Sequence, residues 1–104
     1  METETLRELG LTEGEIKVYL ALTRLGESTS GPLVDESWVS ISKVYLILDK
    51  LAKKGLVSHI LKRETKYFKA ADPDRLLVYL QEKENALKQQ EKTLQKFVSV
   101  LRLE

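Results

Sequence analysis

Residues 40–57 read SISKVYLILDKLAKKGLV, and this stretch decides the fold. Its apolar side chains recur at intervals of three and four residues, which is the spacing of one buried helix face. Ser40 is a favourable N-cap and Gly55 a favourable C-terminal stop, so we expect a helix from about Ser40 to Lys54. The residues expected on its core face are Ile41, Val44, Leu48, Leu51 and Ala52.

Two short runs of strand-forming residues follow this helix, at 57–62 and 65–70. Arg63 and Glu64 separate the two runs, and this spacing predicts a β-hairpin. The connection lacks the Asn-Gly or Asp-Gly pair that favours a two-residue hairpin turn.

Shorter helical segments are expected before residue 40, the first at about 2–9. Thr12 and Glu15 form a capping box, which predicts a helix that continues to about Leu25. Ser30 is expected to cap a short helix over about 31–36. Residues 37–39 then form a turn in which Trp38 is expected to pack into the core. Two helices joined by a short turn and followed by a hairpin predict a winged helix-turn-helix fold.

The last third of the sequence predicts one long helix. Asp72 and Pro73 are a strong helix start, and no glycine or proline follows them. Four leucines then recur at intervals of seven, as in one edge of a coiled-coil seam. The residues expected to form a homodimer interface are Leu80, Leu87, Leu94, Phe97, Val98 and Leu101. The alternative is a single helix that packs only its first turns on the body.

The fold expected for the whole chain is therefore mainly α-helical with a small β-hairpin. Residues 1–71 would form the winged helix-turn-helix domain, and residues 72–104 the long helix for dimerisation.

Charge is unevenly distributed along the chain, although the net charge is only +1. Residues 1–42 contain three Lys/Arg and eight Asp/Glu, whereas residues 43–69 contain eight Lys/Arg and two Asp/Glu. A cationic segment creates a local positive field even in a nearly neutral protein. This field, on a helix and hairpin of this kind, predicts binding to double-stranded DNA. A solvated lysine-rich surface is the alternative interpretation.

The helix after Ser40 would enter the major groove, whose width matches a helix, and the hairpin would contact the backbone or minor groove. Lys43 can reach a guanine edge or a phosphate, and Tyr45 can pack at the core edge with its hydroxyl free to meet a phosphate. Leu46 either touches a thymine methyl group or is an ordinary surface or subunit contact. The full set of expected DNA contacts is Ser40, Ser42, Lys43, Tyr45, Leu46, Lys50, Lys62, Arg63 and Lys66.

Several classes of protein are disfavoured by composition. The chain has no cysteine and a single histidine, His59, so we expect no metal site and no cofactor. A nucleophile–base pair and a glycine-rich phosphate loop are both missing, so we expect no enzyme. No apolar run approaches the about 20 residues needed to cross a bilayer, and the acidic N-terminus does not resemble a signal peptide. A cytoplasmic protein with no membrane partner is therefore expected.

Three stretches resemble the TrmB-like archaeal transcriptional regulators. They are residues 9–22, which read LGLTEGEIKVYLAL; residues 42–57, with Ser42-Lys43-Val44-Tyr45 and Lys54-Gly55-Leu56-Val57; and Lys66-Tyr67-Phe68 followed by Asp72-Pro73. The resemblance covers roughly residues 6–80. It implies a winged helix-turn-helix in which Ser42, Lys43 and the hairpin contact DNA.

The sequence departs from the pattern of these regulators in the turn and on the groove-facing helix. Trp38 and Ser40 stand where the regulators usually have Gly and Pro, and Leu46 stands where a charged residue is common. The 104 residues do not include the sugar-binding effector domain of the full-length regulators, so no small-molecule ligand is expected.

The sequence therefore predicts a DNA-binding transcriptional regulator without an effector domain. A chromatin-like protein that coats DNA with little sequence preference would share this fold and differ in specificity. A protein–protein interaction module is the remaining alternative, for which an exposed Leu46 or Trp38 would be suited.

Overall fold

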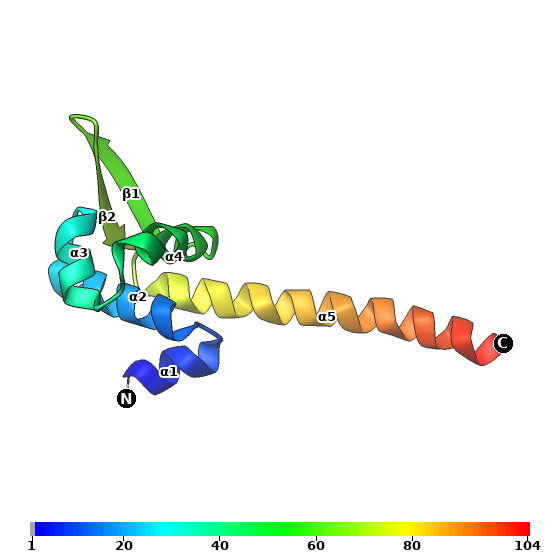
Figure 1. The fold of residues 1–104 in the computed structure, drawn as a ribbon. Helices are drawn as coiled ribbons and strands as arrows, with labels where there is room; N and C mark the ends of the chain where they lie inside the picture. Colours follow the sequence, from blue (N-terminus) through cyan, green and yellow to red (C-terminus); the bar gives the residue numbers. More distant parts are fainter. Residues whose placement is uncertain (1) are drawn as a thin grey trace.

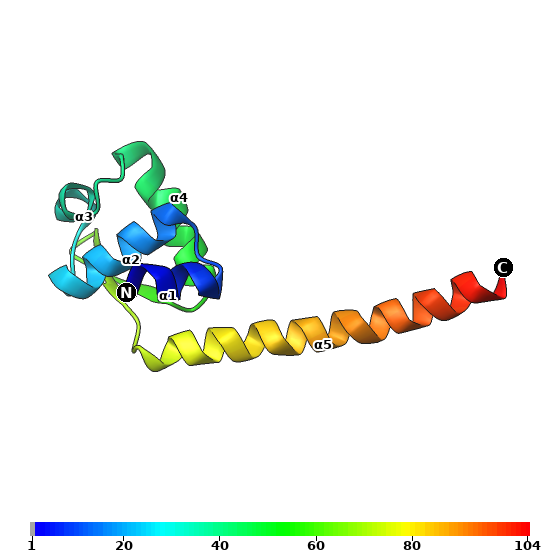
Figure 2. The same ribbon diagram turned by 90° about the horizontal axis from the view of Figure 1, so that it is seen from below.

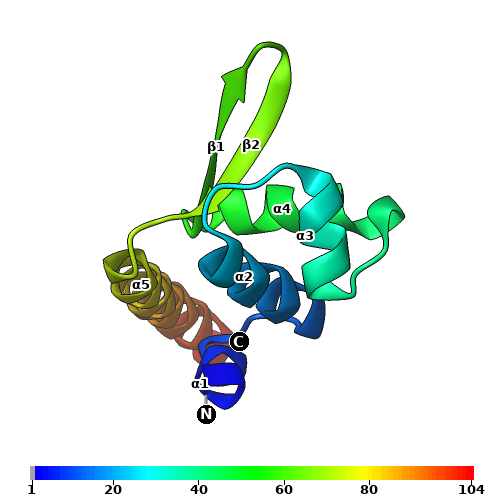
Figure 3. The same ribbon diagram turned by 90° about the vertical axis from the view of Figure 1, so that its left-hand side faces the viewer.

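Within residues 2–104, which the computed structural model describes, the chain forms five helices and one β-hairpin in the expected order (Figure 1). The elements are α1 (Glu2–Leu9), α2 (Glu13–Leu25), α3 (Ser30–Ser37), α4 (Ile41–Lys53), β1 (Val57–Lys62), β2 (Thr65–Ala70) and α5 (Asp74–Leu103). The hairpin projects from one side of the body, and α1 lies at the opposite side (Figures 1 and 3). The mainly α-helical winged helix-turn-helix predicted from the sequence is confirmed.

Helix α2 lies at the centre of the body. Its capping box is present: the Glu15 amide donates to Thr12 Oγ1 at 3.2 Å, and the Thr12 amide donates to Glu15 Oε1 at 2.8 Å. The side chains of α2 that are buried are Glu15, Ile16, Val18, Tyr19, Ala21 and Leu22. They cover more than one helix face because α1, α3, α4 and β2 all contact α2.

The turn between α3 and α4 differs from the sequence prediction. Trp38 has a left-handed backbone, with φ 63° and ψ 21°, and its side chain is 89% exposed. The prediction that Trp38 packs into the core is therefore wrong. Ser37 and Val39 occupy the inward positions on either side of it, and the Ser37 hydroxyl accepts the Val39 amide at 3.2 Å. The cap of α3 is also shifted, because Thr29 precedes the helix and Ser30 is its first residue.

The buried face of α4 is narrower than the sequence predicts. Val44, Leu48 and Leu51 are buried, whereas Ile41 is 56% exposed and Ala52 is also exposed. Ile47, which the sequence analysis left out, packs against the edge of the core. The prediction assigned too wide an arc to the core because α4 meets the body along one side only.

The hairpin pairs Val57 with Ala70, His59 with Phe68, and Lys62 with Thr65. Its base is fixed to the body by Ser28, whose amide and carbonyl exchange hydrogen bonds of 2.8 and 2.7 Å with Phe68. At its tip, both Arg63 and Glu64 have positive φ angles, 49° and 67°, which is the requirement of a type I′ turn. The turn thus has the geometry of Asn-Gly without those residues.

We expect Glu64→Gly to stabilise the fold, because a left-handed backbone costs a residue with a Cβ atom roughly 1–2 kcal/mol and costs glycine little. Glycine also gains entropy in the unfolded chain, so the net rise in unfolding free energy should be about 0.5–1 kcal/mol. Urea denaturation would measure this change. Glu64→Ala keeps the Cβ atom and should give no gain; an equal gain from both variants would contradict the assignment to backbone strain.

Helix α5 begins near its predicted start and then leaves the body (Figure 2). The Asp72 carboxylate accepts the Asp74 amide at 2.8 Å in the turn that precedes the helix, whose N-cap is Pro73 rather than the expected Asp72. Leu76 and Tyr79 pack against the core, and Lys83 donates a hydrogen bond to the carbonyl of Leu9. No residue of α5 is buried in the described chain. None of the described helices combines the length and the apolar character needed to cross a membrane.

Candidate nucleic-acid interface

The N-terminal end of α4 is exposed and polar. Ser40 is its N-cap, and the hydroxyls of Ser40 and Ser42 lie 3.0 Å apart. No side chain caps the helix among the described residues, so the first amides of α4 are left for another acceptor. A helix N-terminus of this kind favours an anion such as a phosphate.

Two lysines keep their charge free on the exposed face of α4. Lys43 and Lys50 are both exposed, and neither forms an ion pair within residues 2–104. The acidic residue on this face, Asp49, is neutralised by Lys53, whose Nζ lies 3.2 Å from Asp49 Oδ2. The face therefore remains positive. Leu46 is 59% exposed between these charges.

Tyr45 joins α4 to its neighbours. Its hydroxyl donates to Ser30 Oγ at 2.9 Å, and its ring meets that of Phe68 edge-on with centroids 6.3 Å apart. The prediction that the Tyr45 hydroxyl is free is therefore wrong, because this hydroxyl already donates its proton to Ser30 of α3. This pair fixes α4 against both α3 and the hairpin. The role of Ser30 was missed because the two residues lie fifteen positions apart in sequence.

The cations of the hairpin divide between its two faces. Lys66 shares a face with His59 and Phe68, and with Tyr45 and Asp49 of α4 it lines a hollow of about 270 Å³ between hairpin and helix. Arg63 lies exposed in the turn.

Lys62 lies on the other face of the hairpin. It forms a 3.0 Å ion pair with Glu27 and stacks over the Tyr67 ring at 5.3 Å. The structure thus brings Lys66, but not Lys62, to the α4 side, because neighbouring residues of a strand alternate between faces.

Glu15 and Lys54 form an ion pair beneath this surface, with 2.6 Å between Oε2 and Nζ. Burial raises the pKa of Glu15, but hydrogen bonds from Lys54 and from the Thr12 amide outweigh burial and hold the pKa below its ordinary value. Lys54 also lies 5.9 Å from the centre of the Tyr79 ring, which contributes a cation–π contact. The pair links α2 to the C-terminal end of α4. It therefore helps to hold α4 in place, with the face that carries Lys43 and Lys50 exposed to solvent.

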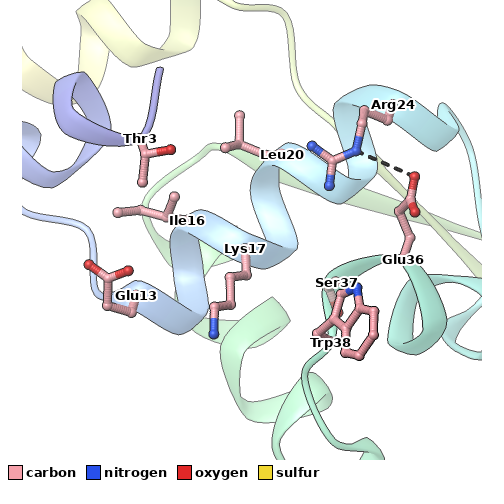
Figure 4. A pocket seen from close by; sticks show the side chains of 9 residues that line it. All are labelled: Thr3, Glu13, Ile16, Lys17, Leu20, Arg24, Glu36, Ser37 and Trp38. Carbon is pink, nitrogen blue, oxygen red and sulfur yellow. Dashed lines mark hydrogen bonds and ion pairs between the residues drawn. The ribbon is translucent and has the colours of Figure 1, made fainter. Parts of the chain in front are cut away.

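A second hollow, of about 530 Å³, lies along α2 and ends at Trp38 (Figure 4). Arg24 and Glu36 pair across it at 3.4 Å, and Lys17 and Glu13 add one charge of each sign. Because this hollow is open and is lined by charges of both signs, it does not form a defined binding site for one ligand. The described residues also hold no cluster of three possible metal ligands.

Comparison with known proteins agrees with this architecture. The family described as "Sugar-specific transcriptional regulator TrmB" matches residues 6–74. The HTH-type sugar sensing transcriptional regulator TrmBL1 of Pyrococcus furiosus is 30% identical over 79 residues, which are 76% of this chain and 23% of that protein.

Two solved structures are also similar. TrmBL2, described as an archaeal chromatin protein with a novel mode of DNA binding, has a TM-score of 0.85 and 25% identity, over 96% of this chain and 40% of that one. A possible transcriptional regulator from Methanosarcina mazei has a TM-score of 0.68 and 14% identity, over 85% of this chain and 79% of that one. The chain thus spans less than half of TrmBL1 and TrmBL2. With the family match covering both helices of the helix-turn-helix and the hairpin, this chain belongs to the TrmB family of transcriptional regulators.

Proposed function

We propose that the chain is a transcriptional regulator that binds double-stranded DNA with α4 in the major groove and the hairpin on the adjacent backbone or minor groove. In this proposal Ser40, Ser42 and the first amides of α4 contact phosphates, and Lys43 reaches a phosphate or a guanine edge. Lys50, Lys66 and Arg63 supply further contacts. Tyr45 positions α4 through its hydrogen bond to Ser30. Lys62 does not reach the groove and contributes only to the positive electrostatic field of the hairpin.

The observation that carries this proposal is the free charge of Lys43 and Lys50 on one exposed face of α4. The nearby acid, Asp49, is held by Lys53, and Lys66 of the hairpin lies on the same side as this face. Exposed lysines that neutralise phosphates release the cations condensed on the DNA, and this release favours binding. The likeness to TrmBL2, which is described with a mode of DNA binding, supports DNA as the ligand.

We expect Lys43→Ala combined with Lys50→Ala to weaken duplex binding roughly 10- to 100-fold, because each lost contact costs about 1 kcal/mol. The dependence of log affinity on log salt should also become shallower by about 2, one counterion for each lysine removed. Fluorescence anisotropy with a labelled duplex, repeated over a series of salt concentrations, measures both quantities.

Lys92→Ala combined with Lys96→Ala is the matched control, since it removes the same charge from the exposed outer side of α5. This control should retain the affinity of the natural chain. Equal binding by the natural chain and the α4 variant at low salt would contradict DNA binding through α4 and favour the protein–protein interaction module.

A general DNA-coating role is a second candidate, favoured by the likeness to TrmBL2, which is described as a chromatin protein. The two roles differ in the ratio of specific to non-specific affinity. Selection from random duplexes at physiological salt separates them: a regulator enriches one sequence motif, whereas a coating protein enriches none.

We further propose that the chain acts as a homodimer through α5, and that it has no catalytic activity. All six interface residues predicted from the sequence are exposed in the single chain. A symmetric homodimer is the commonest assembly that covers such a surface. We also propose a cytoplasmic location, where the chain would meet the DNA that it binds.

A further inference from the structure

A stripe of mainly apolar side chains along α5 has no partner within the described residues 2–104. Its positions alternate at three and four residues, which is the spacing of a coiled-coil seam. They are Leu77, Leu80, Glu84, Leu87, Glu91, Leu94, Val98 and Leu101. The six apolar side chains of this stripe are each more than 40% exposed. The stripe is apolar at both ends and carries two carboxylates near its middle.

The two carboxylates decide the orientation of a helix pair. In a parallel pair each seam residue faces its own copy, so Glu84 would meet Glu84 and Glu91 would meet Glu91. Lys83 would also flank Lys88 of the partner copy, because flanking positions pair five residues apart in a parallel coil. Four repulsions between like charges would then stand within three turns of the helix, because the Lys83–Lys88 contact occurs twice by symmetry.

An antiparallel pair centred on Gln89 removes the carboxylate repulsions. Leu77 then faces Leu101 of the partner copy, and Leu80 faces its Val98. Glu84 and Glu91 face Leu94 and Leu87, so no layer contains two carboxylates. Lys88 of one copy lies beside Lys88 of the other, which is the one like-charge contact of this register, and each Lys88 also lies near Glu91 of the partner copy.

A groove at the base of α5 lies where the far end of an antiparallel partner helix would come. It has a volume of about 360 Å³ and is lined mainly by Leu6 and Leu9 of α1 and by Leu76, Leu77 and Leu80 of α5. In the antiparallel register, Val98 and Leu101 of the partner copy lie opposite Leu80 and Leu77. Phe97, 57% exposed in the single chain, then reaches the groove. In a parallel pair it would have no such cavity.

We propose that two copies of the chain pair through α5 in antiparallel orientation, so that the last turns of each copy close the α1–α5 groove of the other. This inference rests on the proposed homodimer and adds its orientation and register. The two bodies lie at opposite ends of the pair, with the starts of the two α5 helices about 45 Å apart at 1.5 Å per residue.

The chain has no cysteine, so single-cysteine variants test the orientation directly. We would prepare Leu80→Cys and Val98→Cys in the full chain, oxidise each alone, and oxidise an equimolar mixture refolded together. The mixture should yield covalent dimer, and each variant alone should not. In the antiparallel pair the two copies of residue 80 are about 27 Å apart along the axis, whereas a disulfide needs Cα atoms within about 7 Å.

Sedimentation before oxidation separates the two levels of the proposal. A dimeric mass with covalent dimer only in the mixture supports the antiparallel pair. A dimeric mass with covalent dimer from Leu80→Cys alone overturns the orientation and leaves the homodimer intact. A dimeric mass with no covalent product overturns the register. A monomeric mass for the natural chain overturns the homodimer itself.

Discussion

Replacing both Leu87 and Leu94 by lysine is expected to convert the proposed homodimer to a monomer of 11.9 kDa. These leucines are 63% and 53% exposed in the single chain, and the proposed dimer would bury them against the partner helix. Full burial of a leucine contributes about 1.5–3 kcal/mol, and a symmetric dimer contains each leucine twice. In the proposed antiparallel register each new lysine would face Glu84 or Glu91 of the partner copy, so the expected loss of the dimer comes from the lost apolar burial and not from repulsion between cations. Sedimentation equilibrium measures the mass.

The matched control is Gln89→Lys combined with Thr93→Lys, which adds the same charge to the side of α5 away from the leucine row. This control should remain dimeric. The monomeric variant should also lose helical circular dichroism, because the outer part of α5 would stand alone in water and isolated helices of this length are marginal. An unchanged dimeric mass in the leucine variant would refute dimerisation through this row.

Lys54→Met is expected to lower the unfolding free energy by about 3 kcal/mol, because it leaves the buried Glu15 carboxylate without its partner. The lower end of the usual range applies, since the Lys54 side chain is 25% exposed. For a chain of this size the melting temperature should fall by roughly 10–20 °C. Thermal and urea denaturation measure these changes.

Lys53→Met is the matched control for this variant. Lys53 is the neighbouring residue and pairs with Asp49 at the surface, where both side chains are more than half exposed. Such a pair contributes at most about 0.5–1 kcal/mol, so Lys53→Met should change stability little. Equal losses from the two variants would contradict the importance of the buried pair.

The stabilisation by this pair should depend on pH. Hydrogen bonds from Lys54 and Thr12 hold the folded-state pKa of Glu15 below its ordinary value of 4.5, although burial acts in the opposite direction. The unfolded chain therefore takes up this proton at a higher pH than the folded chain does. The contribution is complete above about pH 4.5 and is lost as the pH falls through the folded-state pKa. The difference between the natural chain and Lys54→Met should shrink in the same range.

Much of the fold follows from local patterns in the sequence. The capping box at Thr12 and Glu15 and the spacing of Val44, Leu48 and Leu51 are local features, and the structure confirms both of them. Their physics needs only a few neighbouring residues, because a helix cap or an apolar helix face is set within one or two turns.

The errors arose where two distant segments meet. Trp38 is a large apolar side chain, and composition alone places such a residue in the core. Its actual position follows from the inward-facing Ser37 and Val39 and from a left-handed turn. The Tyr45 hydroxyl donates a hydrogen bond to Ser30 because α3 packs against α4. Sequence spacing gives no sign of that contact.

The sequence by itself determined the order of the helices and the hairpin, the cationic segment at residues 43–69 and the leucine row of α5, because each depends on residues close together in the chain. Only the tertiary structure decided which charges remain free. It neutralises Asp49 with Lys53, directs Lys62 to Glu27 and Lys54 to Glu15, and leaves Lys43 and Lys50 exposed. An ion pair depends on where two side chains lie in space, and packing fixes that only once the chain has folded.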